Sequence, residues 1–143
     1  MLITKECDYG VRIIRALSTG EKKTVEAICG EELIPEQYAY KIIKKLNRAG
    51  FVKSLRGRDG GYQLCKSLDT FTLYDIIVAI DENLFIFDCL REDKPCTRKE
   101  EMGSCAVHVE LDRLQGLLGS EMQRKTVQQV FDEADLSGLD HSH

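Results

Sequence analysis

The chain lacks the segments that would place a protein in or across a membrane. No stretch approaches the roughly 18 consecutive apolar residues that a membrane-spanning helix needs. The opening residues, MLITKECDYG, also lack the apolar core of a signal peptide. We therefore expect a cytoplasmic protein with no membrane contact. With 143 residues, 43% of them hydrophobic, the chain is long enough for one compact domain with an appendage.

Two motifs of redox and cofactor-dependent enzymes are also missing. The chain has no Cys-x-x-Cys pair and no glycine-rich cofactor loop. This argues against a thiol redox enzyme, which stays the least favoured alternative. We predict that the protein is not an enzyme.

Charge is divided unevenly between two parts of the chain. Residues 1–68 hold 13 Lys/Arg against 8 Asp/Glu, whereas residues 69–143 hold 7 against 16. In the first part the basic excess is concentrated between residues 36 and 66. A basic patch of this kind predicts binding to nucleic-acid phosphates, and a solvated basic helix face is the alternative.

The hydrophobic spacing of the first part predicts three helices followed by a β-hairpin. Apolar residues recur at helical spacing up to Leu17, and Thr24 is expected to cap a short second helix. The third helix, residues 35–49, is expected to have Pro35 at its first position. Its buried face should consist of Ala39, Ile42, Ile43 and Leu46. Two strands, residues 51–56 and 61–66, flank an Asp-Gly turn.

This order of elements predicts a mainly α fold with a small β-hairpin, a winged helix-turn-helix. A helix of this kind fills the major groove of DNA, and a thin hairpin with arginines can lie along the backbone or enter the minor groove. We expect the third helix to approach base edges of a double-stranded operator, and the hairpin to contact its backbone or minor groove. The DNA-binding residues predicted are Gln37, Tyr40, Lys41, Lys44, Arg56 and Arg58. A hairpin that merely closes the core is the alternative.

The second part of the chain predicts a loop and a dimerisation helix. After a fourth helix that carries Leu73, Ile76, Ile77 and Ile80, residues 85–104 have no sustained periodicity, which is typical of a functional loop. A long helix from about residue 105 then carries apolar residues at the spacing of a coiled-coil seam. These are Val107, Leu111, Leu114 and Leu118. We expect a homodimer that matches paired half-sites in DNA, with packing inside one chain as the alternative.

These expectations divide the chain into four parts. Residues 1–83 are expected to form the winged helix-turn-helix domain, and residues 84–104 a loop that binds a cluster through the cysteines described next. Residues 105–136 hold the dimerisation helix and a last helix, expected at about residues 126–135 and packed on the domain. Residues 137–143 are expected to be a flexible tail.

Three of the six cysteines lie close together in sequence. Cys89, Cys96 and Cys105 are followed by His108, one helical turn after Cys105. In a reducing cytosol such a group favours metal binding or redox chemistry over disulfides. Structural zinc sites usually contain a short Cys-x2–4-Cys pair, which is absent here. The wider spacing suits an iron–sulfur cluster better, and zinc or reactive or idle thiols stay open.

The other cysteines have no such grouping. Cys29 lies on the apolar face of the second helix and Cys65 in a strand, so burial as small hydrophobic residues is expected for both. For Cys7 the expectation is left open, because it adjoins Asp8.

Two segments and the three clustered cysteines together resemble the Rrf family of bacterial winged-helix regulators, which includes IscR-like and NsrR-like iron–sulfur proteins. The segments are ITKECDYGVRIIRAL and LNRAGFVKSLRGRDGGYQL. The likeness covers nearly the whole chain, and RGRDGGY and the cysteines are its most specific parts. It implies a transcription regulator, usually a repressor. It also implies that a cluster sensing cluster or iron status, oxidants or nitric oxide controls DNA binding.

The resemblance implies Cys89, Cys96 and Cys105 as cluster ligands and leaves two candidates for the fourth. His108 matches the IscR-like pattern, which favours a 2Fe-2S cluster, whereas Asp8 matches the NsrR-like pattern, which allows a 4Fe-4S cluster. We favour His108 because its spacing needs no assumption about subunit arrangement. A solvent-facing position for His108 and an ion pair between Asp8 and Arg12 are the plain alternatives. A cluster-free, thiol- or zinc-dependent regulator of the same fold also stays open.

Overall fold

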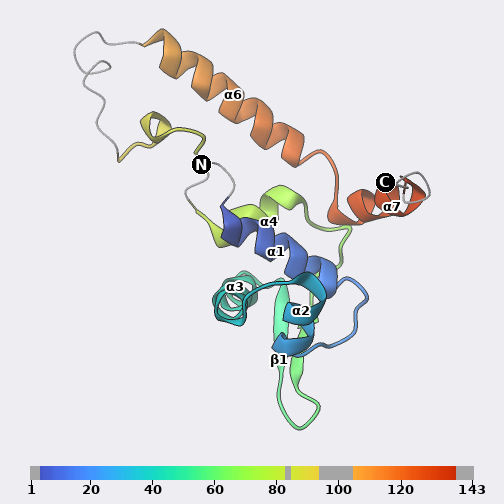
Figure 1. Cartoon of the computed structure of the whole chain (residues 1–143). Coiled ribbons are helices and arrows are strands. Elements are labelled where there is room, and N and C mark those ends of the chain that lie inside the picture. Colours follow the sequence, from blue (N-terminus) through green and yellow to red (C-terminus); the bar gives the residue numbers. More distant parts are fainter. Residues whose placement is uncertain (1–3, 83–84, 94–104, 138–143) are drawn as a thin grey trace.

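The structure is a computed structural model that describes residues 4–82, 85–93 and 105–137 (Figure 1). Its elements in chain order are α1 (Lys5–Ala16), α2 (Val25–Glu32), α3 (Glu36–Arg48), β1 (Val52–Leu55), β2 (Gly61–Leu64), α4 (Leu73–Ile80), the short 3-10 helix η1 (Asp88–Leu90), α6 (Ala106–Met122) and α7 (Val127–Ser137). The mainly α fold with a small hairpin is therefore confirmed. Within these ranges, no helix is long and apolar enough to cross a membrane.

Side-chain caps fix where the helices begin. The Thr24 hydroxyl accepts a hydrogen bond from the Ala27 amide at 3.2 Å, which confirms the predicted cap of α2. At the start of α4, Thr72 and Asp75 form a reciprocal capping box. Pro35, expected at the first position of α3, instead occupies the N-cap with extended backbone, one residue earlier. The Pro35 carbonyl oxygen accepts from the Ala39 amide at 3.1 Å, and an N-cap needs no N–H of its own for the helix, so proline is tolerated there too.

The core is formed where α1, α3 and α4 pack together. The predicted inner face of α3 is buried as expected: Ala39, Ile42, Ile43 and Leu46 are all at most 1% exposed. Helices α1 and α4 approach closely at Gly10, where an added Cβ would lie 1.9 Å from the Ile80 side chain. Because a side chain has no room there, Gly10 permits the crossing that places α1 beside both other helices.

The hairpin is attached to the segment that precedes α2. Strands β1 and β2 pair antiparallel, with Val52 opposite Leu64. Tyr62 also pairs with Lys23 through two backbone hydrogen bonds of 2.8 and 2.9 Å. The tip of the hairpin projects away from the helices, on the opposite side of the molecule from α6 (Figure 1).

The two C-terminal helices differ in how they meet the domain. Helix α7 packs on it as expected, because Val127 is fully buried and its amide donates to the Phe71 carbonyl at 2.9 Å. Helix α6 extends away from the other helices, and none of its residues is buried (Figure 1). The segment before η1 lies beside α6, where the Ile86 amide donates to the Gln115 side chain at 2.8 Å.

Candidate nucleic-acid interface and cysteine ligands

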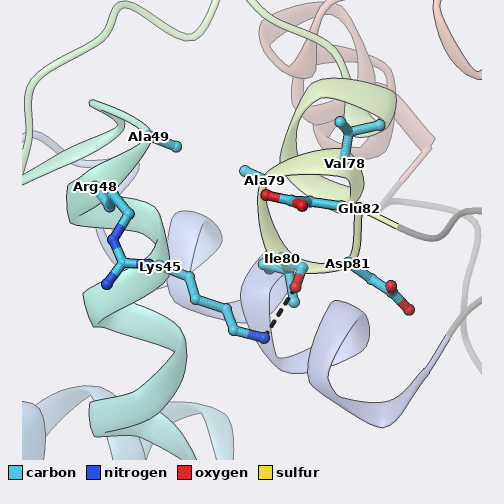
Figure 2. A pocket seen from close by; sticks show the side chains of 8 residues that line it. All are labelled: Lys45, Arg48, Ala49, Val78, Ala79, Ile80, Asp81 and Glu82. Carbon is cyan, nitrogen blue, oxygen red and sulfur yellow. Dashed lines mark hydrogen bonds between the residues drawn. The ribbon is translucent and has the colours of Figure 1, made fainter.

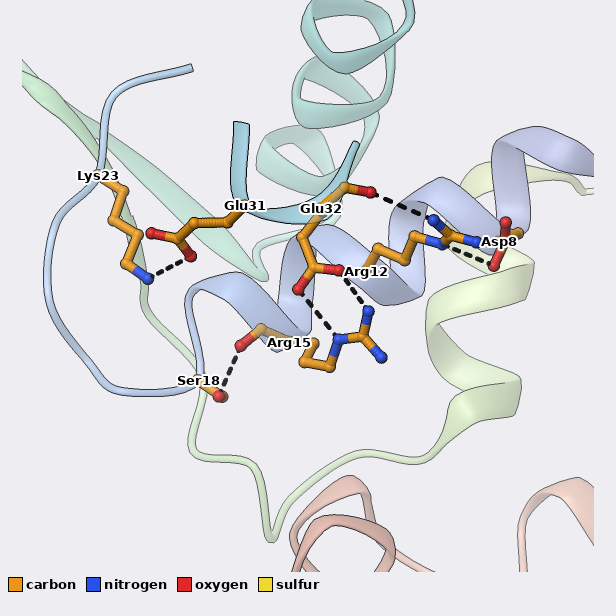
Figure 3. Close-up of polar contacts among 7 residues, drawn as sticks. All are labelled: Asp8, Arg12, Arg15, Ser18, Lys23, Glu31 and Glu32. Carbon is orange, nitrogen blue, oxygen red and sulfur yellow. Dashed lines mark hydrogen bonds and ion pairs between the residues drawn. The ribbon is translucent and has the colours of Figure 1, made fainter. Parts of the chain in front are cut away.

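The end of α2 is fixed to α1 by two arginines. Arg15 forms a two-point ion pair with the buried carboxylate of Glu32, and Arg12 donates to the Glu32 carbonyl oxygen at 3.2 Å (Figure 3). The hydrogen bond with Glu32 raises the pKa of Arg15. Helix α2 then ends at its C-cap Leu33, whose φ of 55° is left-handed. These contacts set where α3 begins relative to α1.

The outer face of α3 carries the predicted DNA-binding residues. Gln37, Tyr40, Lys41 and Lys44 are all exposed. Lys41 is nevertheless engaged, because its ammonium group lies 2.8 Å from Oε1 of Glu6, in the first turn of α1. The other oxygen of Glu6 lies 3.2 Å from Lys45. Hydrogen bonds, first from Lys41 and then from Lys45, lower the pKa of Glu6 despite its partial burial.

Lys45 also spans a pocket of about 450 Å³ between the C-terminal ends of α3 and α4 (Figure 2). Its lining residues are Lys45, Arg48, Ala49, Val78, Ala79, Ile80, Asp81 and Glu82. The Lys45 ammonium group donates to the Ile80 carbonyl oxygen at 3.0 Å, where a helix C-terminus favours a cation. This contact ties α3 to the end of α4.

The hairpin of β1 and β2, residues 52–64, is the wing of the fold, and it presents arginines on a glycine-rich turn. Gly57 has a φ of 115°, a conformation that L side chains rarely adopt, and its carbonyl oxygen accepts from the Gly60 amide at 3.0 Å. Arg56 and Arg58 are exposed, and among the described residues neither has an ion-pair partner. Both guanidinium groups are therefore free to meet an external anion.

The candidate iron ligands come from three elements. Cys89 lies in η1, Cys105 is the N-cap of α6, and His108 follows in the first turn of α6, all three half-buried. Asp8 in α1 forms the ion pair considered as its alternative role, 3.2 Å from Arg12. Cys96 lies outside the described residues. Within those residues, no three His, Cys, Asp or Glu side chains are grouped as metal ligands.

The remaining cysteines lie in different surroundings. Cys7 is fully buried, and Cys29 is half-buried, where burial and the carboxylates of Glu36 and Glu26 raise the pKa of its thiol. The expectation that Cys65 is buried is wrong. Strand β2 ends at Leu64, two residues before its predicted end, so Cys65 lies exposed beyond the sheet, with its thiol 3.0 Å from the Gly50 carbonyl oxygen.

The predicted dimerisation residues lie on an accessible helix. Val107 is 65% exposed and Leu114 40%, whereas Leu111 and Leu118 are half-buried. Two further apolar side chains that the heptad spacing did not single out are also exposed: Val109 and Leu117. The apolar surface of α6 is therefore wider than the predicted seam.

Helix α3 beside a projecting hairpin, on a three-helix core, defines a winged helix-turn-helix protein. The family model Rrf2, described as "Iron-dependent Transcriptional regulator", matches residues 3–133. The chain therefore belongs to the Rrf2 family of transcriptional regulators.

Curated relatives match parts of the chain. Protein aau3 of Rhizobium meliloti is 31% identical over 62% of this chain and 59% of its own length. The putative HTH-type transcriptional regulator slr0846 of Synechocystis is 33% identical over 66% of each. The HTH-type transcriptional regulator NsrR of Geobacillus kaustophilus is 28% identical over 62% of this chain and 63% of its own. Each match thus spans less than two thirds of the relative.

Solved structures share the fold over nearly the whole chain. T. potens IscR has a TM-score of 0.73 and 18% identity, covering 100% of this chain and 93% of its own. CymR, described as the global cysteine regulator of B. subtilis, has a TM-score of 0.67 and 22% identity, covering 91% and 95%.

Proposed function

We propose that this protein is a cytoplasmic, homodimeric DNA-binding repressor whose binding to its operator is controlled by an iron–sulfur cluster. The observation that carries the proposal is the exposed basic surface formed by α3 and the unpaired wing arginines, in a member of the Rrf2 family. Phosphate contacts supply much of the affinity of such a surface and make it depend on salt.

Helix α3 and the wing have different roles in this proposal. Gln37, Tyr40 and Lys41 approach base edges in the major groove, because a helix face of this width fits there and side chains at its surface reach the bases. Lys44 contacts the backbone beside them. Arg56 and Arg58 lie along the adjacent backbone or minor groove, where guanidinium groups are favoured.

Helix α6 is the proposed dimer interface. It exposes Val107, Leu114 and neighbouring apolar side chains to solvent in a single chain, and a contiguous apolar face on an extended helix is typical of a protein contact. A second copy would bury this face and present two wings to two half-sites. The hairpin tip projects on the side of the molecule opposite α6, so the proposed DNA surface stays open in such a dimer (Figure 1).

Cys89, Cys96 and Cys105 are the proposed cluster ligands, with His108 or Asp8 as the fourth. The donor chemistry fits, because thiolates bind iron–sulfur clusters and imidazole and carboxylate both suit iron. When bound, the cluster supplies a group that responds to iron supply, oxidants or nitric oxide. With His108, all four ligands come from one segment that ends in the first turn of α6. With Asp8, the ligands join that segment to α1.

A cluster-free, thiol- or zinc-dependent regulator is the second candidate. CymR, whose fold this chain shares, is described as a cysteine regulator.

Anaerobic purification followed by visible absorption and by iron and sulfide assays separates the two candidates. A coloured protein with matching iron and sulfide supports the cluster, whereas a colourless protein with zinc or no metal contradicts it. Titration of the same preparation with duplex DNA tests the DNA-binding role, which an absence of binding at low salt would contradict.

A further inference from the structure

Glu6 makes a contact that the DNA-binding role does not explain. Its Oε1 atom lies 2.8 Å from the ammonium group of Lys41, and its Oε2 atom lies 3.2 Å from that of Lys45. Both carboxylate oxygens therefore accept hydrogen bonds from lysines of α3. A negative group on the surface proposed to meet the phosphates weakens DNA binding, so its presence there calls for an explanation.

The two lysines are held to different degrees. Lys45 has a second acceptor, the Ile80 carbonyl oxygen at 3.0 Å, and its side chain is 32% exposed. Lys41 pairs with Glu6 in the part of the chain that the structure describes, and its side chain is 60% exposed. Lys41 is therefore the lysine that an approaching phosphate can reach, but only in competition with Glu6.

We propose that Glu6 is a specificity-determining residue that occupies Lys41 in place of a DNA phosphate. This inference rests on the proposed DNA binding. On random DNA, where only phosphate contacts are offered, Lys41 stays with Glu6 and adds nothing to binding. At the operator, Lys41 leaves Glu6 for a base edge, and the base contacts made by α3 offset the loss of the ion pair. Glu6 thus lowers the affinity for DNA of arbitrary sequence.

Replacement of the carboxylate by an amide makes this measurable. Glu6→Gln keeps the size of the side chain and frees Lys41, while Lys45 keeps its bond to Ile80. One additional phosphate contact steepens the dependence of log affinity on log salt by about 0.9. The gain in affinity for a random duplex should then be about 3.5 times larger at about 50 mM than at about 200 mM salt.

The experiment titrates the full-length, anaerobically purified protein with a random-sequence duplex at several salt concentrations. Glu6→Gln is compared with Glu133→Gln on the remote helix α7. This control removes the same charge and also breaks an ion pair, the one between Glu133 and Lys125. The change at Glu6 is repeated in a Lys41→Met background, where no lysine is left to be freed. Glu6→Asp, which keeps the charge but withdraws it by one carbon, serves if the amide variant does not fold.

The expected result is a steeper salt dependence for Glu6→Gln, a smaller increase for Glu6→Asp, and none for Glu133→Gln or in the Lys41→Met background. A Glu6→Gln protein with the salt dependence of the wild type overturns the inference, as does an equal increase in the Lys41→Met background. A wild-type protein that binds no duplex contradicts the proposed function itself, and the inference with it.

Discussion

Alanine at Gly61 should detach the wing from the segment before α2. An added Cβ would lie 2.6 Å from the Lys23 carbonyl oxygen, whereas ordinary contact needs about 3.4 Å, so the two backbones must separate by about 0.8 Å. The two hydrogen bonds between Lys23 and Tyr62, now 2.8 and 2.9 Å, would then exceed the usual range of about 2.7–3.2 Å. At about 1 kcal/mol each, their loss lowers the free energy of unfolding by about 2 kcal/mol.

Thermal unfolding measures this effect. In a chain of this size, a loss of about 2 kcal/mol corresponds to a Tm lower by about 7 °C. Gly30→Ala is the matched control, because its Cβ would meet nothing within 4 Å and it lies inside α2. Alanine should stabilise that helix by about 1 kcal/mol. A Gly61→Ala protein that melts with the wild type and binds DNA equally well would refute the role of the Lys23–Tyr62 bridge in holding the wing.

Three further predictions concern the wing, the dimer interface and the fourth cluster ligand. Arg58→Ala should weaken binding to all duplexes alike and lower the salt slope by about one, and unchanged titrations would remove the wing from the interface. Leu114→Asp should give monomers in sedimentation and lose operator binding. A wild-type monomer at micromolar concentration would count against the dimer. For the fourth ligand, His108→Ala should shorten cluster lifetime and alter the visible spectrum after anaerobic reconstitution. The choice of His108 is wrong if only Asp8→Ala does so.

Local patterns predicted most of the fold. The spacing of apolar residues located the buried face of α3, the Asp-Gly turn located the hairpin, and Thr24 marked the start of α2. The ion pair between Asp8 and Arg12 was also foreseeable, because residues four apart share a helix face.

Contacts between distant parts of the chain could not be predicted from such local patterns. Glu6 and Lys41 are separated by 35 positions and meet only because α1 and α3 pack together. No sequence pattern signals that a predicted DNA-binding lysine already has a partner. The exposure of Cys65 depends on a strand that ends at Leu64, two residues earlier than predicted, because sequence patterns locate the ends of elements poorly.

The central claim is that α3 and the wing of a symmetric dimer read double-stranded DNA. Selection of bound duplexes from a random-sequence pool, with the anaerobically purified protein, tests it most directly. The account predicts enrichment of sequences with two half-sites related by twofold symmetry, their centres about one helical turn of 34 Å or a multiple of it apart. A folded, dimeric protein that enriches no sequence over the starting pool would contradict it.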